Sequence, residues 1–206
     1  MTEVASKREQ AREERRRQIL EAALAVFSRK GFHAANVSDV AAEAGVSQGT
    51  IYWYFESKEE LLNAALLAFF VDFGVESFRA VEGCETAEEK LRCLGRSMEG
   101  FSETAEGLFT LFLSYWSSSD KRDEVAQMWA ELLAEYKDLV VGIIEEGVRS
   151  GEFRPLDADS LVWAILGAYD GLAAYGLLMP DMDLSRINDV FMGTVISGLK
   201  AGTGVS

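Results

Sequence analysis

The sequence predicts an all-α fold of about nine helices, and three observations support this prediction. Only two prolines, Pro155 and Pro180, occur in the 206 residues, so few positions oppose a helix. No segment sustains the alternation of Val, Ile or Thr with polar residues that is typical of a β-strand. Apolar residues instead return every three or four positions, which places them on one face of a helix.

The first predicted helix runs from about Ala11 to Lys30 and ends at Gly31, because glycine commonly follows the last turn of a helix. Its apolar stripe consists of Ile19, Ala22, Ala23, Val26 and Phe27. A short helix follows from about Val37 to Ala44, with Asn36 or Ser38 available as its cap. The glycine after it breaks this second helix.

A third helix is expected over 48–55, with Ser47 as its cap. Ser57 caps a long fourth helix that continues to about Ala80. The run "SKEE" places Glu60 three residues after Ser57, which is the pattern of a capping box.

Five further helices are expected over about 86–104, 106–117, 122–150, 157–179 and 184–200. The clearest breaks between them are "SSSD" at 117–120, "SGEFRPLD" at 150–157 and "MPDMD" at 179–183. No internal repeat or low-complexity segment interrupts this series.

Charge divides the chain unevenly. Residues 1–58 contain 9 Lys and Arg against 8 Asp and Glu, whereas residues 59–206 contain 11 against 26. The net charge of -14 would by itself argue against a nucleic-acid partner, but almost all of it lies in the second part. The two parts are therefore expected to face different partners.

A cytoplasmic location is predicted from two features. The two cysteines, Cys84 and Cys93, have a spacing that fits neither a metal knuckle nor a redox pair. The first residues, "MTEVASKREQAREERRRQ", carry charge without the apolar core of a signal peptide. We therefore expect a protein that stays in a reducing cytoplasm.

One segment, 161–179, is nearly long enough to cross a bilayer. It contains Asp170 at its centre and many small residues, and its acidic flanks supply no basic anchor. A buried helix in a protein without a membrane partner is therefore expected.

The two short helices joined by "AGVS" form a candidate helix-turn-helix motif, over about 36–55. Helical spacing assigns the inner face to Val37, Val40, Ala41, Ala44, Val46, Ile51 and Phe55. Gln48, Gly49, Thr50 and Trp53 then point outward, with Tyr52 and Tyr54 at the edges. In such motifs the second helix enters the major groove of DNA.

These outward residues suit DNA. Gln48 can pair with a base edge, Gly49 allows close approach, and Thr50 offers a methyl and a hydroxyl group. The Tyr hydroxyls, the Trp N–H and Lys58 can bind phosphate, and Arg15 to Arg17 could reach the flanking backbone. Two alternatives stay open: an aromatic run is more often core or protein interface, and an arginine run near Glu13, Glu14 and Glu21 is usually a solvated face.

The stretch "ILEAALAVFSRKGFHAANVSDVAAEAGVSQGTIYWYFESKEELL" resembles the N-terminal domain of the TetR family of bacterial transcriptional regulators, over about 13–73. The matching marks are Ala23, Phe27, Gly31, Phe32, Val40, Ala41, the run "AGVS", Gly49, Tyr52, Phe55, Lys58 and Glu59. Gln48 stands where Lys or Arg is common in the family, and Trp53 and Tyr54 replace a commoner Tyr and His. These departures concern which operator sequence is read.

The resemblance implies a homodimer in which a three-helix domain binds a palindromic double-stranded DNA operator. It also implies a larger helical ligand-binding and dimerisation domain, 74–206, whose small-molecule effector releases the DNA, as in a repressor. The residues expected to contact DNA are Arg17, Asn36, Ser47, Gln48, Gly49, Thr50, Tyr52, Trp53, Tyr54 and Lys58.

The larger domain is rich in aromatic residues, which suit a cavity for a flat or apolar effector. The candidate effector-binding residues are Phe73, Met98, Phe101, Phe112, Trp116, Trp129, Trp163 and Asp170. Asp170 is a carboxylate in an apolar helix, so a cationic ligand group, a Tyr hydroxyl, an Arg or a second subunit is expected beside it. The alternative is a carboxylate at an interface or at the edge of solvent.

The last two predicted helices are expected to form the dimer interface. Apolar and small residues recur there at helical spacing, namely Ile187, Val190, Phe191, Thr194, Val195 and Gly198. Small residues in the preceding helix, Gly167, Gly171, Ala174 and Gly176, allow close approach. Two such helices from each subunit would make a four-helix bundle.

An enzyme is not expected. His33 is the single histidine, so neither a His-based catalytic triad nor a multi-His metal site can be built. No glycine-rich phosphate-binding loop occurs, and we expect no metal and no cofactor. The alternative to a regulator is a small-molecule-binding or protein-interaction module that retains the fold without binding an operator.

Overall fold

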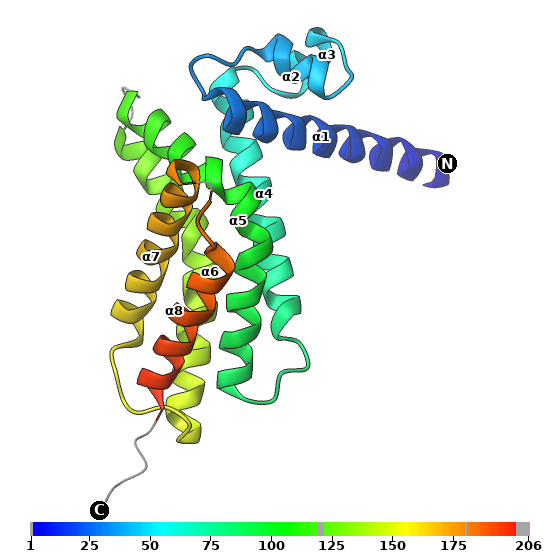
Figure 1. Ribbon diagram of the computed structural model, residues 1–206. Helices are drawn as coiled ribbons and strands as arrows, with labels where there is room; N and C mark the ends of the chain where they lie inside the picture. Colours follow the sequence, from blue (N-terminus) through cyan, green and yellow to red (C-terminus); the bar gives the residue numbers. More distant parts are fainter. Residues whose placement is uncertain (1, 119–121, 180, 201–206) are drawn as a thin grey trace, which may run out of the picture. The chain divides into compact units, whose positions relative to one another are not determined.

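The structure is a computed structural model that describes residues 2–118, 122–179 and 181–200. Over these residues the fold is all-α, as predicted, with eight helices (Figure 1). They are α1 (Thr2–Lys30), α2 (Val37–Glu43), α3 (Gln48–Tyr54), α4 (Lys58–Val81), α5 (Ala87–Ser118), α6 (Arg122–Ser150), α7 (Ala158–Leu178) and α8 (Leu184–Leu199).

Two elements differ from the prediction. The helices expected over 86–104 and 106–117 form one continuous helix, α5, which accounts for eight helices in place of about nine. Ser102, Thr104 and Gly107, on either side of the expected break, are weak helix formers, but propensity is a small effect beside tertiary packing. The first helix begins at Thr2 instead of Ala11, because residues 2–18 are rich in Arg, Glu and Gln, which favour helix.

The chain divides into two compact units. The first consists of Met1–Val71 with Leu111–Arg122, and the second of Asp72–Thr110 with Asp123–Ser206. The division falls inside α4 and α5, so each of these helices contributes to both units. The domains expected from the sequence, 13–73 and 74–206, remain a prediction. The two divisions differ most for 111–122, which the prediction assigns to the second domain and the structure to the first compact unit.

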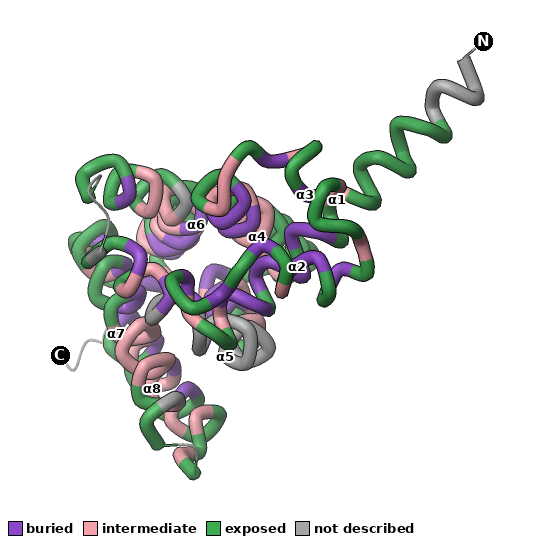
Figure 2. The backbone as a smooth tube through the Cα atoms, turned by 90° about the horizontal axis from the view of Figure 1, so that it is seen from above, coloured by how far each residue is buried: buried purple, intermediate pink, exposed green. Residues whose placement is uncertain are grey.

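The first unit has a core around the end of α1. Its fully buried side chains include Ile19, Phe27, Val40, Ile51 and Leu62, whereas residues 7–18 of α1 are mostly exposed (Figure 2). The predicted inner face of the helix-turn-helix motif is buried, except that Val46 is half-buried.

Polar contacts fix α1 to α2 in this unit. Gln18 Nε2 donates a hydrogen bond of 3.0 Å to the carbonyl of Ala44. Lys30 Nζ lies 2.8 Å from Asp39 Oδ1, and Asp39 Oδ2 accepts a hydrogen bond of 2.9 Å from the N–H of Asn36. Asn36 is therefore the cap of α2, held to α1 through Asp39.

The core of the second unit lies between α5, α6, α7 and α8. The parts of these helices that belong to this unit lie alongside one another in Figure 1. The "GEFRP" turn after α6 closes onto this core: the N–H of Phe153 donates to the carbonyl of Gly147 at 3.0 Å. The N–H of Arg154 donates to the carbonyl of Leu199 at 2.8 Å. This turn thus joins the end of α6 to the end of α8.

Within the described residues, α4 is the one helix long and apolar enough to cross a membrane, judged by length and composition alone. Core helices of soluble proteins meet the same criterion, so this finding is weak. The segment weighed from the sequence, 161–179, belongs to α7, which buries Val162, Ile165 and Leu166 but exposes Trp163. It is therefore buried on one face only, and the expectation of no membrane partner remains a prediction.

Candidate functional site

The exposed side of α3 gathers the residues expected to contact DNA. Ser47 caps this helix, because its Oγ accepts a hydrogen bond of 3.1 Å from the N–H of Thr50. Gln48 and Gly49 are exposed in its first turn, and a methyl group in place of the Gly49 hydrogen would meet only Ser47 Oγ, at 3.8 Å. The start of α3 therefore presents an open surface that backbone or base edges can approach.

The four aromatic residues of "YWYF" divide into two exposed and two packed rings. Tyr52 and Trp53 are 52% and 64% exposed, whereas Phe55 is buried. Tyr54 is half-buried, and its hydroxyl donates a hydrogen bond of 3.2 Å to the main-chain carbonyl of Arg12. The Tyr54 ring also meets the Trp53 ring edge to face, with centroids 4.7 Å apart.

Arginines of α1 stack on this aromatic run. The guanidinium carbon of Arg12 lies 4.9 Å from the centroid of Trp53, and that of Arg16 lies 5.7 Å from the centroid of Phe55. Such cation–π contacts at exposed sites contribute about 0.5–1 kcal/mol each. They also hold two positive charges beside α3, where a phosphate backbone would pass. Arg12 was not among the residues expected to contact DNA. The sequence does not reveal that this part of α1 packs beside Trp53 of α3.

Lys58, at the first position of α4, is half-buried with its Nζ 4.4 Å from the centroid of Phe32. Burial lowers the pKa of this amine, although the neighbouring Glu59 carboxylate acts in the opposite direction. The ammonium group is therefore partly desolvated, which strengthens its interaction with an anion.

Arg17 and Asn36 have contacts within the chain. Arg17 Nη2 lies 2.7 Å from Glu14 Oε1, and Arg17 Nη1 lies 2.6 Å from Glu21 Oε1. The same hydrogen bond and charge lower the pKa of Glu14. These pairs are what the solvated-face alternative expects, while Asn36 caps α2. Contact of either residue with DNA stays a prediction.

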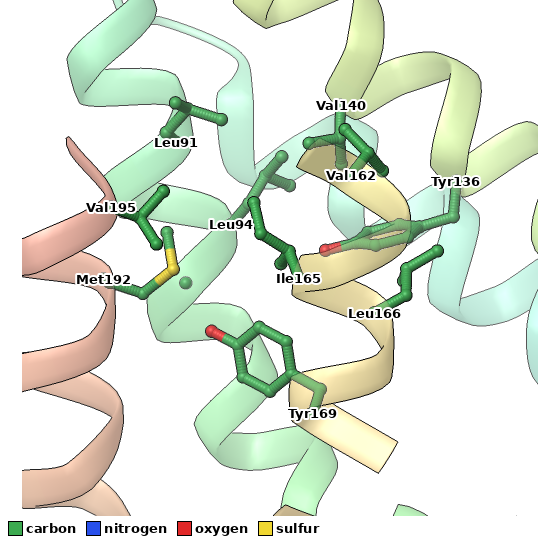
Figure 3. Close-up of a pocket in the computed structure, with 11 residues that line it drawn as sticks. Leu91, Leu94, Tyr136, Val140, Val162, Ile165, Leu166, Tyr169, Met192 and Val195 are labelled. Carbon is green, nitrogen blue, oxygen red and sulfur yellow. The ribbon is translucent and has the colours of Figure 1, made fainter. Parts of the chain in front are cut away.

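The second unit contains a small cavity between its four helices, with a volume of about 20 Å³ (Figure 3). That volume holds about one water-sized sphere. The cavity is lined by Leu91, Leu94 and Gly95 of α5, Tyr136 and Val140 of α6, Val162, Ile165, Leu166 and Tyr169 of α7, and Met192 and Val195 of α8. An effector larger than a water molecule can bind there only if the lining side chains or their helices move.

Two tyrosines give this apolar cavity its polar groups. The hydroxyl of Tyr169 donates a hydrogen bond of 2.6 Å to Asn188 Oδ1, and Asn188 Nδ2 donates to the carbonyl of Gly95 at 3.1 Å. Tyr136 is buried and has no hydrogen-bond partner among the described residues, and burial raises the pKa of its hydroxyl. The Tyr136 hydroxyl points into the cavity (Figure 3), so it is suited to bind a polar group that enters there.

The described residues that were expected to bind an effector lie outside the lining of this cavity. Phe73 packs on Tyr136, with ring centroids 4.9 Å apart. Phe112 and Trp129 are half-buried, and Trp163 is exposed.

Trp116 belongs to the first unit, with the Arg122 guanidinium carbon 5.7 Å from the centroid of its ring. The side chains of Met98 and Phe101 lie outside the described residues. None of the six described candidates, Asp170 included, lines the cavity, and their effector contacts stay predictions.

The residues that line the cavity were not predicted from the sequence. The predicted effector-binding residues are mostly aromatic, whereas the lining is mostly aliphatic. Helical spacing was the available signal, since Ile165, Leu166 and Tyr169 share one face of α7. Asp170, the next residue, is half-buried on another face. Desolvation raises the pKa of its carboxyl to about 6, and no hydrogen bond or ion pair to a described residue satisfies it. The alternative of a carboxylate at an interface or solvent edge agrees with this placement.

Comparison with known proteins covers both units. Residues 19–65 match the model of bacterial regulatory proteins of the tetR family, and residues 84–174 match a tetracyclin repressor-like C-terminal domain. The chain is 28% identical over 184 residues to the fatty acid metabolism regulator protein of Bacillus subtilis, covering 88% of this chain and 94% of that one. It is 30% identical over 154 residues to the HTH-type transcriptional repressor KstR2 of Mycobacterium tuberculosis, covering 70% and 72%.

A solved structure extends this similarity to three dimensions. The crystal structure of the transcriptional regulator FadR from Bacillus subtilis, in complex with stearoyl-CoA, superposes with a TM-score of 0.76 at 28% identity. The superposition covers 88% of this chain and 98% of that one. The described relatives are transcriptional regulators rather than enzymes.

Proposed function

Because the chain belongs to the TetR family of bacterial regulatory proteins and is a ligand-responsive DNA-binding transcriptional regulator, we propose how it performs this function. It is a cytoplasmic repressor that binds a palindromic operator as a homodimer through α3 and the start of α4. An effector with a long apolar chain binds in the second unit and releases the DNA. Each of these three steps is supported by different residues.

The exposure of Tyr52 and Trp53 beside Gln48 is the observation that carries DNA binding. Large rings left in water are costly unless a partner covers them, and Arg12 adds positive charge at the same place. Sugars and phosphates can cover these rings while the start of α3 reaches base edges. Ser47 and Thr50, whose hydroxyl oxygens are 2.8 Å apart, complete the surface.

The test is binding to the DNA that flanks the protein's own gene, measured at several salt concentrations. We expect sequence-selective binding that weakens as salt rises, because released counterions drive phosphate contacts. Gln48→Ala should change the preferred bases, whereas Gln127→Ala, an exposed glutamine of α6, should change nothing. Binding that is equal for all sequences, or absent at low salt, would instead favour a module that keeps the fold without an operator.

The effector is proposed to carry a long apolar chain because the cavity lining is almost entirely aliphatic. The relative FadR was crystallised with stearoyl-CoA, and its fold covers most of this chain. The Tyr136 hydroxyl, which points into the cavity, would bind the polar group where the chain begins. Since the cavity is about 20 Å³ without a ligand, binding has to enlarge it, and separation of its helices is the movement proposed to weaken DNA binding.

This step is tested by isothermal titration with stearoyl-CoA, stearate and coenzyme A without a chain. If stearoyl-CoA and stearate bind but coenzyme A does not, the acyl chain is recognised. If only stearoyl-CoA binds, the head group is also needed. Leu166→Trp should fill the cavity and weaken binding of the chain, whereas Ala164→Trp on the exposed face of α7 serves as its control. Equal affinity in both variants would place the effector elsewhere.

The homodimer is proposed to form through α7 and α8. Tyr175, Leu178 and Val190 are 52%, 75% and 64% exposed, and a methyl group added to Gly167 or Gly171 would meet nothing within 4 Å. An apolar surface with small residues suits close helix packing. Val190→Lys should convert the dimer into a monomer in analytical ultracentrifugation, whereas Asp189→Lys should not. A dimer that survives Val190→Lys would contradict this interface.

A further inference from the structure

The two cysteines bring their sulfur atoms to 3.0 Å from each other, although nine positions separate them in the sequence. Cys84 lies just beyond the end of α4, and Cys93 lies in the second turn of α5. The chain reverses at Gly83, whose φ of 83° is costly for other residues, and this turn carries Cys84 back toward α5. The spacing in the sequence predicted no redox pair, because it does not reveal this turn.

A disulfide bond needs a sulfur–sulfur distance of about 2.05 Å, so the two thiols are roughly 1 Å from bonding distance. Both side chains are half-buried, which leaves a small oxidant access to them. We propose that Cys84 and Cys93 form a reversible disulfide within the chain when the protein meets a hydroperoxide. The pair is a modification site in the second unit, separate from the residues that contact DNA.

Charges around the pair give each thiol a different role. Arg96 Nη2 donates a hydrogen bond of 3.2 Å to Cys93 Sγ, which places a positive charge beside the sulfur. The hydrogen bond with Cys93 raises the pKa of the Cys84 thiol, followed in size by burial and by the charges of Cys93 and Glu89, while the charge of Arg96 acts in the opposite direction. Because the Arg96 guanidinium bonds the Cys93 sulfur directly, Cys93 is assigned as the thiol that attacks.

The reaction balances with one hydroperoxide as the oxidant. The Cys93 thiolate attacks the outer oxygen, the O–O bond breaks and a sulfenic acid forms. The alkoxide, or the hydroxide when the oxidant is hydrogen peroxide, leaves and takes up the proton that Cys93 lost. Cys84 then attacks the oxidised sulfur, so that the S–S bond forms, the S–O bond breaks and water leaves with the Cys84 proton. Two thiols have lost two electrons and two hydrogens in total, and a small dithiol can restore them.

The disulfide would attach the connection after α4 to the first two turns of α5. Leu91 and Leu94, which lie on either side of Cys93 in the sequence, line the cavity. Oxidation should therefore stiffen this wall of the cavity, and amide hydrogen exchange over residues 84–93 should slow after oxidation. This expectation can be measured without any effector or DNA, so it stands apart from the proposed function.

The test treats the whole purified protein with hydrogen peroxide and then blocks remaining thiols with N-ethylmaleimide. We expect an intact mass that has lost two hydrogens and gained no label, a linked Cys84–Cys93 peptide, and two labelled thiols after dithiothreitol. Cys84→Ser should instead accumulate a sulfenic acid on Cys93 that a dimedone probe captures. Two labelled thiols after peroxide, a disulfide between chains, or oxidation that dithiothreitol does not reverse would overturn the proposal.

A matched pair of variants tests the role of Arg96. Arg96→Leu should slow disulfide formation several-fold, because the attacking sulfur loses its neighbouring charge. Arg92→Leu removes a charge from the same helix that bonds Glu88 Oε1, 2.9 Å from its Nη2, and should leave the rate unchanged. Equal slowing in both variants would overturn the assignment of Cys93 as the attacking thiol.

Discussion

The hydroxyl of Tyr54 donates a hydrogen bond of 3.2 Å to the main-chain carbonyl of Arg12, which joins α3 to α1 across 42 positions of sequence. Tyr54 thus stabilises the arrangement of helices, while its neighbour Trp53 remains 64% exposed. Adjacent aromatic residues therefore have separable roles, one in stability and one in binding.

Tyr54→Phe should lower the free energy of unfolding by about 0.5–1.5 kcal/mol, because it removes one hydrogen bond and leaves the ring. Trp53→Ala should lower the free energy of unfolding by about 0.5–1 kcal/mol, because it removes the cation–π contact with Arg12, but should weaken DNA binding several-fold. Urea denaturation and fluorescence anisotropy with labelled DNA measure the two quantities. If Trp53→Ala unfolds the protein or binds DNA as well as before, the proposed division of roles is wrong.

Phe55→Ala should destabilise the first unit by about 3–5 kcal/mol, because it leaves a cavity where a 2% exposed ring was packed. Loss of DNA binding should follow from unfolding of α3 rather than from a lost contact. Circular dichroism during urea denaturation checks this. Phe55→Leu, which keeps most of the volume, should recover much of the stability.

Gly147→Ala should destabilise the second unit by about 1–3 kcal/mol, because the added methyl group would lie 2.2 Å from Phe153 Cδ2. Gly142→Ala in the same helix meets nothing within 4 Å and should stabilise it by roughly 0.5–1 kcal/mol. Thermal denaturation of both variants makes the comparison. Equal shifts would mean that the turn at Phe153 adapts without cost.

Asp170 predicts a pH dependence of stability. Its pKa is about 6 in the folded protein and about 3.9 in an unfolded chain. The folded state therefore binds more protons between these values, so stability falls as pH rises through this window and is constant above it. Asp170→Asn should be more stable than the parent protein at pH 7, and this advantage should shrink toward pH 4. An advantage independent of pH would contradict the raised pKa.

Much of the fold was predictable because its signals are local. The ends of α6 and α8 agree with prediction to within a residue, since "SSSD", "SGEFRPLD" and "MPDMD" contain strong breakers. Of the capping box predicted at "SKEE", the Ser57 half is present, because Ser57 Oγ accepts a hydrogen bond of 3.0 Å from the N–H of Glu60. The Glu60 carboxylate accepts instead from the N–H of Glu56, at 2.6 Å. The spacing of Ser57 and Glu60 predicts that both side chains lie at the start of α4. The geometry of the preceding turn decides which backbone N–H the Glu60 carboxylate bonds.

The sequence by itself determined the all-α class, the helix-turn-helix motif and the family, because periodicity, caps and a dense motif are read from neighbouring residues. Only the tertiary structure decided which of Tyr52, Trp53 and Tyr54 stay exposed and that the cavity is lined by aliphatic side chains. It alone also brought Cys84 to Cys93. These outcomes depend on how distant segments pack and on where the chain turns. The pattern of neighbouring residues in the sequence specifies neither of them.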